Sequence, residues 1–196
     1  RLTNEFLGED VVDDEARQEL ADGLVDHQLD IGWAVETILR SEWFFCDANV
    51  GSRVCDPVTF LLAPLRAIEC WRQTPSTLIL AEWLNRLGQD LFYPPNVGGW
   101  NGGRTWLTTR TVIARANYAD AVANGTLASP PSPPDIASSD RDPELVAQQL
   151  ATLTLGDSKD EVIARICKDS SSESSGRPNL NVALASLLTE PQVHLH

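Results

Sequence analysis

Residues 91–117 read LFYPPNVGGWNGGRTWLTTRTVIARAN, and this stretch decides the fold that the sequence predicts. Prolines restrict φ and glycines release it, so Tyr93–Asn96 followed by four glycines is typical of a shaped loop at the end of a helix. Trp100 and Trp106 bracket the glycines, which we expect to let backbone pass where a Cβ would clash. A long helix is predicted to begin near Thr105.

That helix has two apolar sides, which is the pattern of a buried central helix. One side carries Val112, Ile113, Ala116, Ala119 and Ala123. The other carries Leu107, Ala114, Tyr118 and Ala121. Arg115 lies on one edge between these sides, and Arg110 with Asn117 lies on the other. We therefore expect at least one guanidinium to be partly buried and to need a partner.

The rest of the chain shows helical periodicity and no useful strand alternation. Helix starts are predicted at Asp30, Asp56 with Pro57, and Ser76, and a helix end at Gly88. In the helix after Asp30 the residues expected to point inward are Ile31, Val35, Ile38 and Leu39. The predicted fold is all-α, an irregular multi-helix bundle of about eight helices around the central Pro/Gly/Trp loop and the buried helix.

Composition changes after Gly125 and predicts three segments. Residues 1–127 form the main helical domain, and residues 128–142 form a Pro/Ser-rich connection. Residues 143–196 form a C-terminal helical subdomain, which we expect to pack on the first. The Ser-rich run within it and the two histidines at the chain end, His194 and His196, are predicted to be exposed.

Charge and motif content exclude several functions. A formal charge of −13 argues against a nucleic-acid binder, since such binding depends on clustered Lys and Arg. No apolar run reaches the about 20 residues that span a bilayer. No phosphate-binding loop, GxSxG or HExxH motif is present, and we predict no cofactor and no metal site. The chain begins at Arg1 and has no methionine, so we expect it to be part of a longer protein.

The four cysteines give no zinc signature, because no CxxC pair occurs. Cys46 and Cys55 bound a short loop that could be closed by a disulfide in an oxidising compartment, or carry two thiols in a reducing one. The spacing leaves both open. Cys70 and Cys167 lie in apolar helical patterns and are predicted to be core residues.

Residues 87–119, LGQDLFYPPNVGGWNGGRTWLTTRTVIARANYA, closely resemble the signature of a bacterial family known only as domain of unknown function 1800. Four further segments resemble that family, and the likeness spans most of the chain: Leu2–Asp10, Ile38–Phe44, Pro57–Ile68 and Ala185–Val193. The chain departs from the family at Asn101, where Pro is common, and at Thr59, where Glu is common. If that Glu normally contributes chemistry or an ion pair, this chain lacks it.

The resemblance implies candidates for binding a ligand or partner, and it assigns no catalytic residue. These candidates are Asn96, Trp100, Trp106, Arg115, Asn117 and Arg66. The composition of the loop, with Arg beside Trp, adds Arg104 as a candidate. The resemblance also implies a periplasmic or otherwise exported protein, in which a Cys46–Cys55 bridge could form, so the bridge and two free thiols both stay open. Family members are often encoded beside an exported protein similar to the sulfatase and alkaline phosphatase superfamily, which is therefore the expected partner.

Two functions follow as hypotheses. The first is a non-catalytic helical scaffold or binding module, in which the tryptophans of the loop form a packed wedge. The second is part of a hydrolase acting on a polar or sulfated glycan, with Trp faces beside Arg and Asn forming the pocket and further catalytic residues in a missing N-terminal region. A hydrolase should point Arg104, Arg115 or Asn117 into an open cleft, whereas a scaffold should have them paired and covered.

Overall fold

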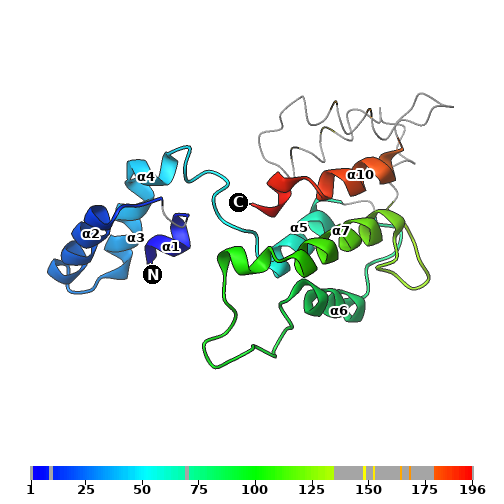
Figure 1. The fold of residues 1–196 in the computed structure, drawn as a ribbon, viewed down its shortest axis with the longest axis horizontal. Helices are drawn as coiled ribbons and strands as arrows, with labels where there is room; N and C mark the ends of the chain where they lie inside the picture. Colours follow the sequence, from blue (N-terminus) through cyan, green and yellow to red (C-terminus); the bar gives the residue numbers. More distant parts are fainter. Residues whose placement is uncertain are drawn as a thin grey trace. The chain divides into compact units, whose positions relative to one another are not determined.

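The computed structural model describes residues 2–8, 11–68, 71–134 and 179–195, together with the single residues 148, 152, 164 and 168. These residues hold eight α-helices, two short 3-10 helices and no strand, so the predicted all-α class is confirmed (Figure 1). An isolated antiparallel bridge joins Val54 and Leu195. None of the described helices is long and apolar enough to cross a bilayer.

The chain divides into two compact units. The first comprises Arg1–Val54 with Leu195–His196, and the second comprises Cys55–His194. No signal in the sequence marks a boundary at Val54, because the helix-start signal lies two residues later at Asp56. The predicted division into 1–127, 128–142 and 143–196 stays a prediction, since much of the last two segments lies outside the described residues.

The first unit is a small helical cluster. Its helices are α1 (Leu2–Phe6), α2 (Asp14–Asp26), α3 (Ile31–Arg40) and α4 (Glu42–Phe45). The predicted cap at Asp30 is confirmed, because its carboxylate accepts hydrogen bonds from the amides of Gly32 and Trp33. Asp13 caps α2 in the same way. Both caps satisfy amides that the first helical turn leaves without intrahelical partners.

The core of this unit is formed by Leu7, Val12 and Ile38. The prediction that Ile31 and Leu39 point inward is wrong, since they are 61% and 37% exposed. The buried side of α3 is centred on Ala34 and Ile38, four residues apart, and this narrow stripe leaves the outer apolar residues in solvent.

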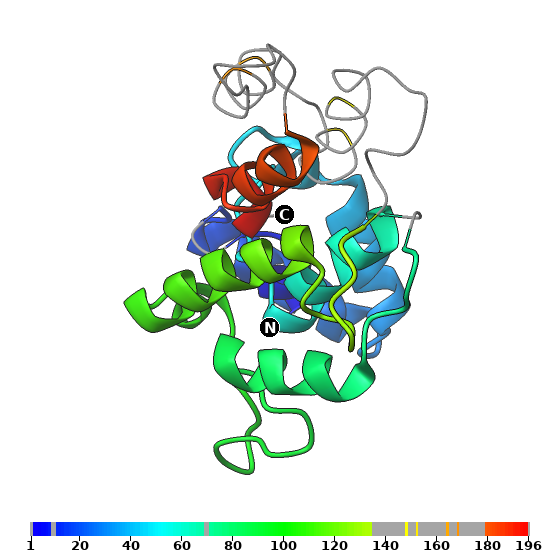
Figure 2. The same cartoon turned by 90° about the vertical axis from the view of Figure 1, so that its right-hand side faces the viewer.

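The second unit is built around α7. Its α-helices are α5 (Pro57–Ala67), α6 (Thr77–Leu87), α7 (Thr109–Asn124) and α10 (Leu180–Leu188), and its 3-10 helices are Gly103–Trp106 and Pro191–His194. Figures 1 and 2 both show α7 lying between α10 and α6, and α7 packs against both. The predicted central helix is therefore present.

The start and the faces of α7 differ from the prediction. It begins at Thr109 instead of Thr105, because the preceding residues form a 3-10 turn and Thr108 makes a capping box with Thr111. Val112 and Ile113 are 43% and 57% exposed. The buried face instead carries Thr111, Arg115, Tyr118, Ala119, Ala121, Val122 and Ala123.

Cys46 and Cys55 are both free thiols, so the disulfide that the sequence left open is not formed in this structure. The Sγ of Cys46 donates to the carbonyl of Trp43 at 3.1 Å, and Cys55 is buried. The two residues also belong to different compact units. Cys70 and Cys167 lie outside the described residues.

The capping box of α7 gives a direct test of how the central helix is held. The Thr108 hydroxyl accepts from the Thr111 amide, whereas Ser76, at the start of α6, makes no side-chain capping bond. We expect Thr108→Ala to lower the free energy of unfolding by about 1 kcal/mol, and Ser76→Ala to lower it by less than about 0.5 kcal/mol. Urea denaturation measures both, and equal losses would contradict the assignment.

Candidate functional site

Arg115 is the most deeply buried charged group in the described part of the chain, with 0% of its surface exposed. Its Nη2 donates to the Cys55 carbonyl at 2.6 Å, and its Nη1 lies 3.4 Å from Nδ1 of His194. The guanidinium carbon is 4.5 Å from the centre of the Phe60 ring, close enough for a cation–π interaction. The predicted burial and pairing of a guanidinium on α7 is thus observed.

The two partners of Arg115 are the first and last residues of the second unit. The Cys55 amide also donates to the His194 carbonyl at 2.8 Å, so these two residues are bonded to each other as well as to Arg115. The ring of His194 lies 5.3 Å from that of Phe60. Arg115 therefore joins both ends of the unit to its central helix.

No carboxylate within the described ranges forms an ion pair with Arg115, and its Nε has no hydrogen-bond partner there. Burial lowers the pKa of Arg115, while the Cys55 thiol and Asp56 act to raise it. Burial, with a smaller effect of the Arg115 charge, lowers the pKa of His194 to about 4. His194 is thus neutral at pH 7, when its Nδ1 can accept from Arg115.

The Cys55 thiol beside this arginine is not activated. Burial raises its pKa to about 11, and the opposing effect of Arg115 is smaller. A thiol with such a pKa is protonated at neutral pH and is a poor nucleophile. Burial also raises the pKa of Tyr118, whose hydroxyl donates to the Leu61 carbonyl at 2.7 Å. Both groups stabilise the core without offering a reactive centre.

The other predicted candidates do not converge with Arg115. Trp106 is buried and Trp100 is half-buried. The four other candidates have exposed side chains: Arg66, Asn96, Arg104 and Asn117. The Asn96 carboxamide accepts from the Gly98 amide within its own turn. Arg115 is therefore buried, whereas most of the other candidates lie on the surface.

The loop that carries most of these candidates is exposed. Residues 91–98 are all exposed, including Phe92 at 90%, Tyr93 at 75% and fully accessible Val97. The expectation that its glycines allow close packing is wrong for Gly99 and Gly102, since a Cβ on either would meet nothing within 4 Å. Gly99 instead supplies a positive φ of 86°. The wedge is limited to Trp106 and, in part, to Trp100.

Sequence reasoning missed two contributors to these sites. His194 was expected at an exposed chain end, yet it is half-buried against Arg115 and Phe60. No local pattern marks a residue whose partner is 79 positions away. Phe92 is the second residue that sequence reasoning did not single out. Phe92 and Tyr93 directly precede Pro94 and Pro95, and prolines at these positions end the preceding helix. An aromatic pair that follows a helix end could therefore have been recognised as exposed.

Comparison with known proteins gives one match. A family model described as "Protein of unknown function (DUF1800)" matches residues 1–195. No curated protein matches, and no solved structure matches.

Replacing Arg115 tests its structural role. Arg115→Ala leaves the Cys55 carbonyl unsatisfied and opens a cavity beside Phe60, so we expect a loss of about 3 kcal/mol or more in the free energy of unfolding. Arg110→Ala changes the same residue type at an exposed position of α7 and should cost no more than about 0.5 kcal/mol. Denaturant unfolding compares the two variants. Similar losses of stability would refute the role of Arg115 in holding both ends of the second unit against α7.

The lowered pKa of His194 predicts a pH-dependent stability. Between pH 6.5 and about 4 the unfolded chain binds a proton at this residue and the folded chain does not, so stability falls as pH falls through this window. We expect His194→Gln to flatten the dependence over that range relative to wild type. Unfolding curves at pH 5, 6 and 7 measure it, and parallel slopes in both proteins would contradict the assignment.

Proposed function

The chain belongs to the family described as protein of unknown function (DUF1800), and from this starting point we propose that it is a non-catalytic helical scaffold whose loop at residues 91–100 binds a partner protein. The observation that supports this most strongly is the exposure of three apolar side chains on that loop, Phe92, Tyr93 and Val97. Contiguous exposed apolar residues are typical of interaction sites.

The backbone at Phe92 supports the same proposal. Its φ of 67° lies in the left-handed region, which disfavours residues with a Cβ by about 1–2 kcal/mol. The ring is 90% exposed, so contacts with its own chain do little to offset that free energy. Strained residues of this kind concentrate at functional sites. A partner that covers the ring would supply the compensating contact.

The loop is held firmly at its base, which favours binding because less freedom is lost on association. On one side, Leu87 ends α6 in the core and the Asn85 amide group donates to the Asp90 carboxylate at 2.7 Å. On the other side, Trp106 is buried and its carbonyl accepts from the Thr111 hydroxyl at 2.9 Å. The exposed tip therefore projects from two fixed ends.

Arg115 also favours a scaffold over the alternative glycan hydrolase. Of the three residues that a hydrolase could point into an open cleft, Arg115 is buried and hydrogen-bonded to the Cys55 carbonyl, as a scaffold requires. Arg104 and Asn117 are exposed, so they are the residues through which the hydrolase is tested. We propose that the protein acts outside the bacterial cytoplasm and that its partner is an exported protein similar to sulfatases and alkaline phosphatases. The loop would then serve as the apolar contact between the two.

Phe92→Gly separates the partner contact from folding. Glycine relieves the left-handed strain and removes little buried area, so we expect the free energy of unfolding to stay unchanged or to rise by up to about 1 kcal/mol. The same change removes the exposed ring, so capture of a sulfatase-like partner should fall at least tenfold. A pull-down with the exported sulfatase-like protein, alongside urea unfolding, measures both.

Leu78→Ser is the matched control, because Leu78 is a 77% exposed apolar residue of the same unit on α6. Its capture of the partner should equal that of wild type. Equal capture by Phe92→Gly and wild type would refute the loop as the contact. Turnover of a glycan that Arg104→Ala or Asn117→Ala abolishes would instead support the hydrolase.

A further inference from the structure

A cavity of about 460 Å³ lies within the first unit, and none of its lining residues belongs to the loop at residues 91–100. It falls in the size range of small-molecule sites. Its walls come from all four helices of the unit and from the segments between them. The apolar lining includes Leu7, Val12, Ala16, Leu20, Ile38 and two tryptophans, Trp33 and Trp43.

Trp33 is held in place on both sides. A Cβ on Gly23 would lie 2.4 Å from its ring, so the indole rests directly against the glycine backbone of α2. The His27 ring stacks on it with centroids 4.1 Å apart and planes at 9°. Trp43, in α4, is 37% exposed. The cavity thus has one fixed aromatic wall and one aromatic side chain open to solvent.

The hydroxyl and carboxyl groups of the lining offer acceptors only. The hydroxyl of Thr37 donates to the Trp33 carbonyl at 2.8 Å, and that of Ser41 donates to the Ile38 carbonyl at 2.7 Å. A hydroxyl has a single proton to donate, so these groups keep only lone pairs for a ligand. The three remaining groups are the carboxylates of Glu19 and Glu42 and the hydroxyl of Thr3, which donates to the Asn4 carboxamide at 3.4 Å.

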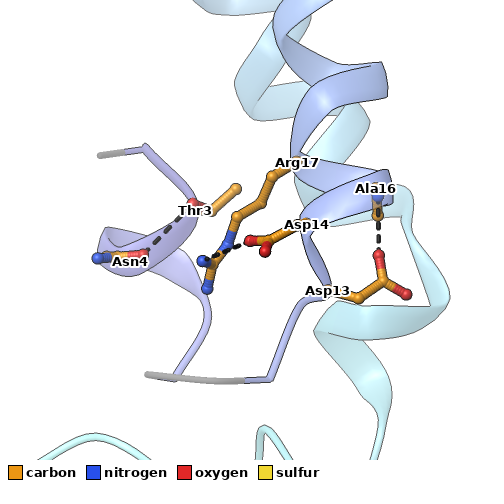
Figure 3. A network of polar contacts seen from close by, with 6 residues as sticks. All are labelled: Thr3, Asn4, Asp13, Asp14, Ala16 and Arg17. Carbon is orange, nitrogen blue, oxygen red and sulfur yellow. Dashed lines mark hydrogen bonds and ion pairs between the residues drawn. The ribbon is translucent and has the colours of Figure 1, made fainter.

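No cation among the described residues neutralises these two carboxylates. Arg17, the arginine of α2, lies toward α1 and pairs with Asp14 at 3.6 Å (Figure 3). Arg40 pairs with Glu36 at 3.0 Å, and Arg53 donates to the Glu5 carbonyl. Residues 1–54 contain thirteen acidic and four basic side chains, a formal charge of −9 out of −13 for the chain. The cavity therefore lies in a strongly negative unit.

We propose that this cavity binds a small amine with an apolar body. The body fills the space against Leu7, Val12 and Ile38, and the ammonium group lies between Glu19 and Glu42 beside the indole faces. Each element has a physical counterpart: an ammonium group donates three hydrogen bonds, is attracted by carboxylates and favours the face of Trp. An anionic ligand would meet repulsion and few free donors.

Three ligands with one body test the proposal on the full chain: phenethylamine, its N-acetyl amide and phenylpropionate. Binding is followed by NMR shifts of backbone amides and of the Trp33 and Trp43 indole N–H groups. We expect phenethylamine to shift signals of the lining and to bind at least fivefold more tightly than the neutral amide, because the indole faces and the carboxylates both attract the ammonium group. Phenylpropionate should bind most weakly.

The double variant Glu19→Gln/Glu42→Gln should lose about tenfold in affinity for phenethylamine while its affinity for the amide stays unchanged. Glu36→Gln is the control, because it removes a carboxylate from the same unit outside the cavity lining. Equal affinity for the amine and the amide would show that the cavity does not recognise the ammonium group, and this would overturn the proposal. Absence of lining shifts at millimolar phenethylamine, or saturation by a basic peptide in place of the amine, would overturn it too.

Discussion

The hydrogen bond from the Arg115 guanidinium to the Cys55 carbonyl is the constraint on which the second unit depends. A buried cation without a carboxylate partner is unfavourable unless other groups replace its hydration. Three groups do so in part: a carbonyl oxygen, the lone pair of neutral His194 and the face of Phe60. All three positions are occupied only when both ends of the unit lie against α7, so the cost of burying the charge selects one arrangement of the ends.

The same helix fixes the loop. Thr108 and Thr111 form the capping box at its first turn, and the Thr111 hydroxyl also bonds the Trp106 carbonyl at the foot of the loop. Thr111, which holds the foot of the loop, lies about one helical turn before Arg115 on α7. Stability and presentation of Phe92 are therefore coupled through a single rigid element, while the ring itself contributes little to the core. This arrangement allows the tip to change without unfolding the unit.

Local signals predicted what local physics controls. The caps at Asp30, Asp56 and Gly88 follow from residue type and position alone, and all three are observed. The pattern of the central helix correctly implied a buried arginine, although Val112 and Ile113, which it places on one of the apolar faces, are exposed. The pattern could not name the partners of that arginine, since Cys55 and His194 are 60 and 79 positions away and contribute a backbone carbonyl and one ring nitrogen. Neither contact leaves a periodic or compositional trace.

The tryptophans show why residue type alone does not identify a site. In the second unit Trp106 is 8% exposed and supports the loop, so its ring is unavailable to a ligand. In the first unit Trp33 has its position set by Gly23 and His27 and still lines an open cavity with unpaired carboxylates. The difference arises from what surrounds each indole: Trp106 is buried beside Gly88 and Thr111, whereas Trp33 lies between two helices of an acidic unit. An acidic surface favours solvation over further packing, and this keeps the cavity accessible to a cation.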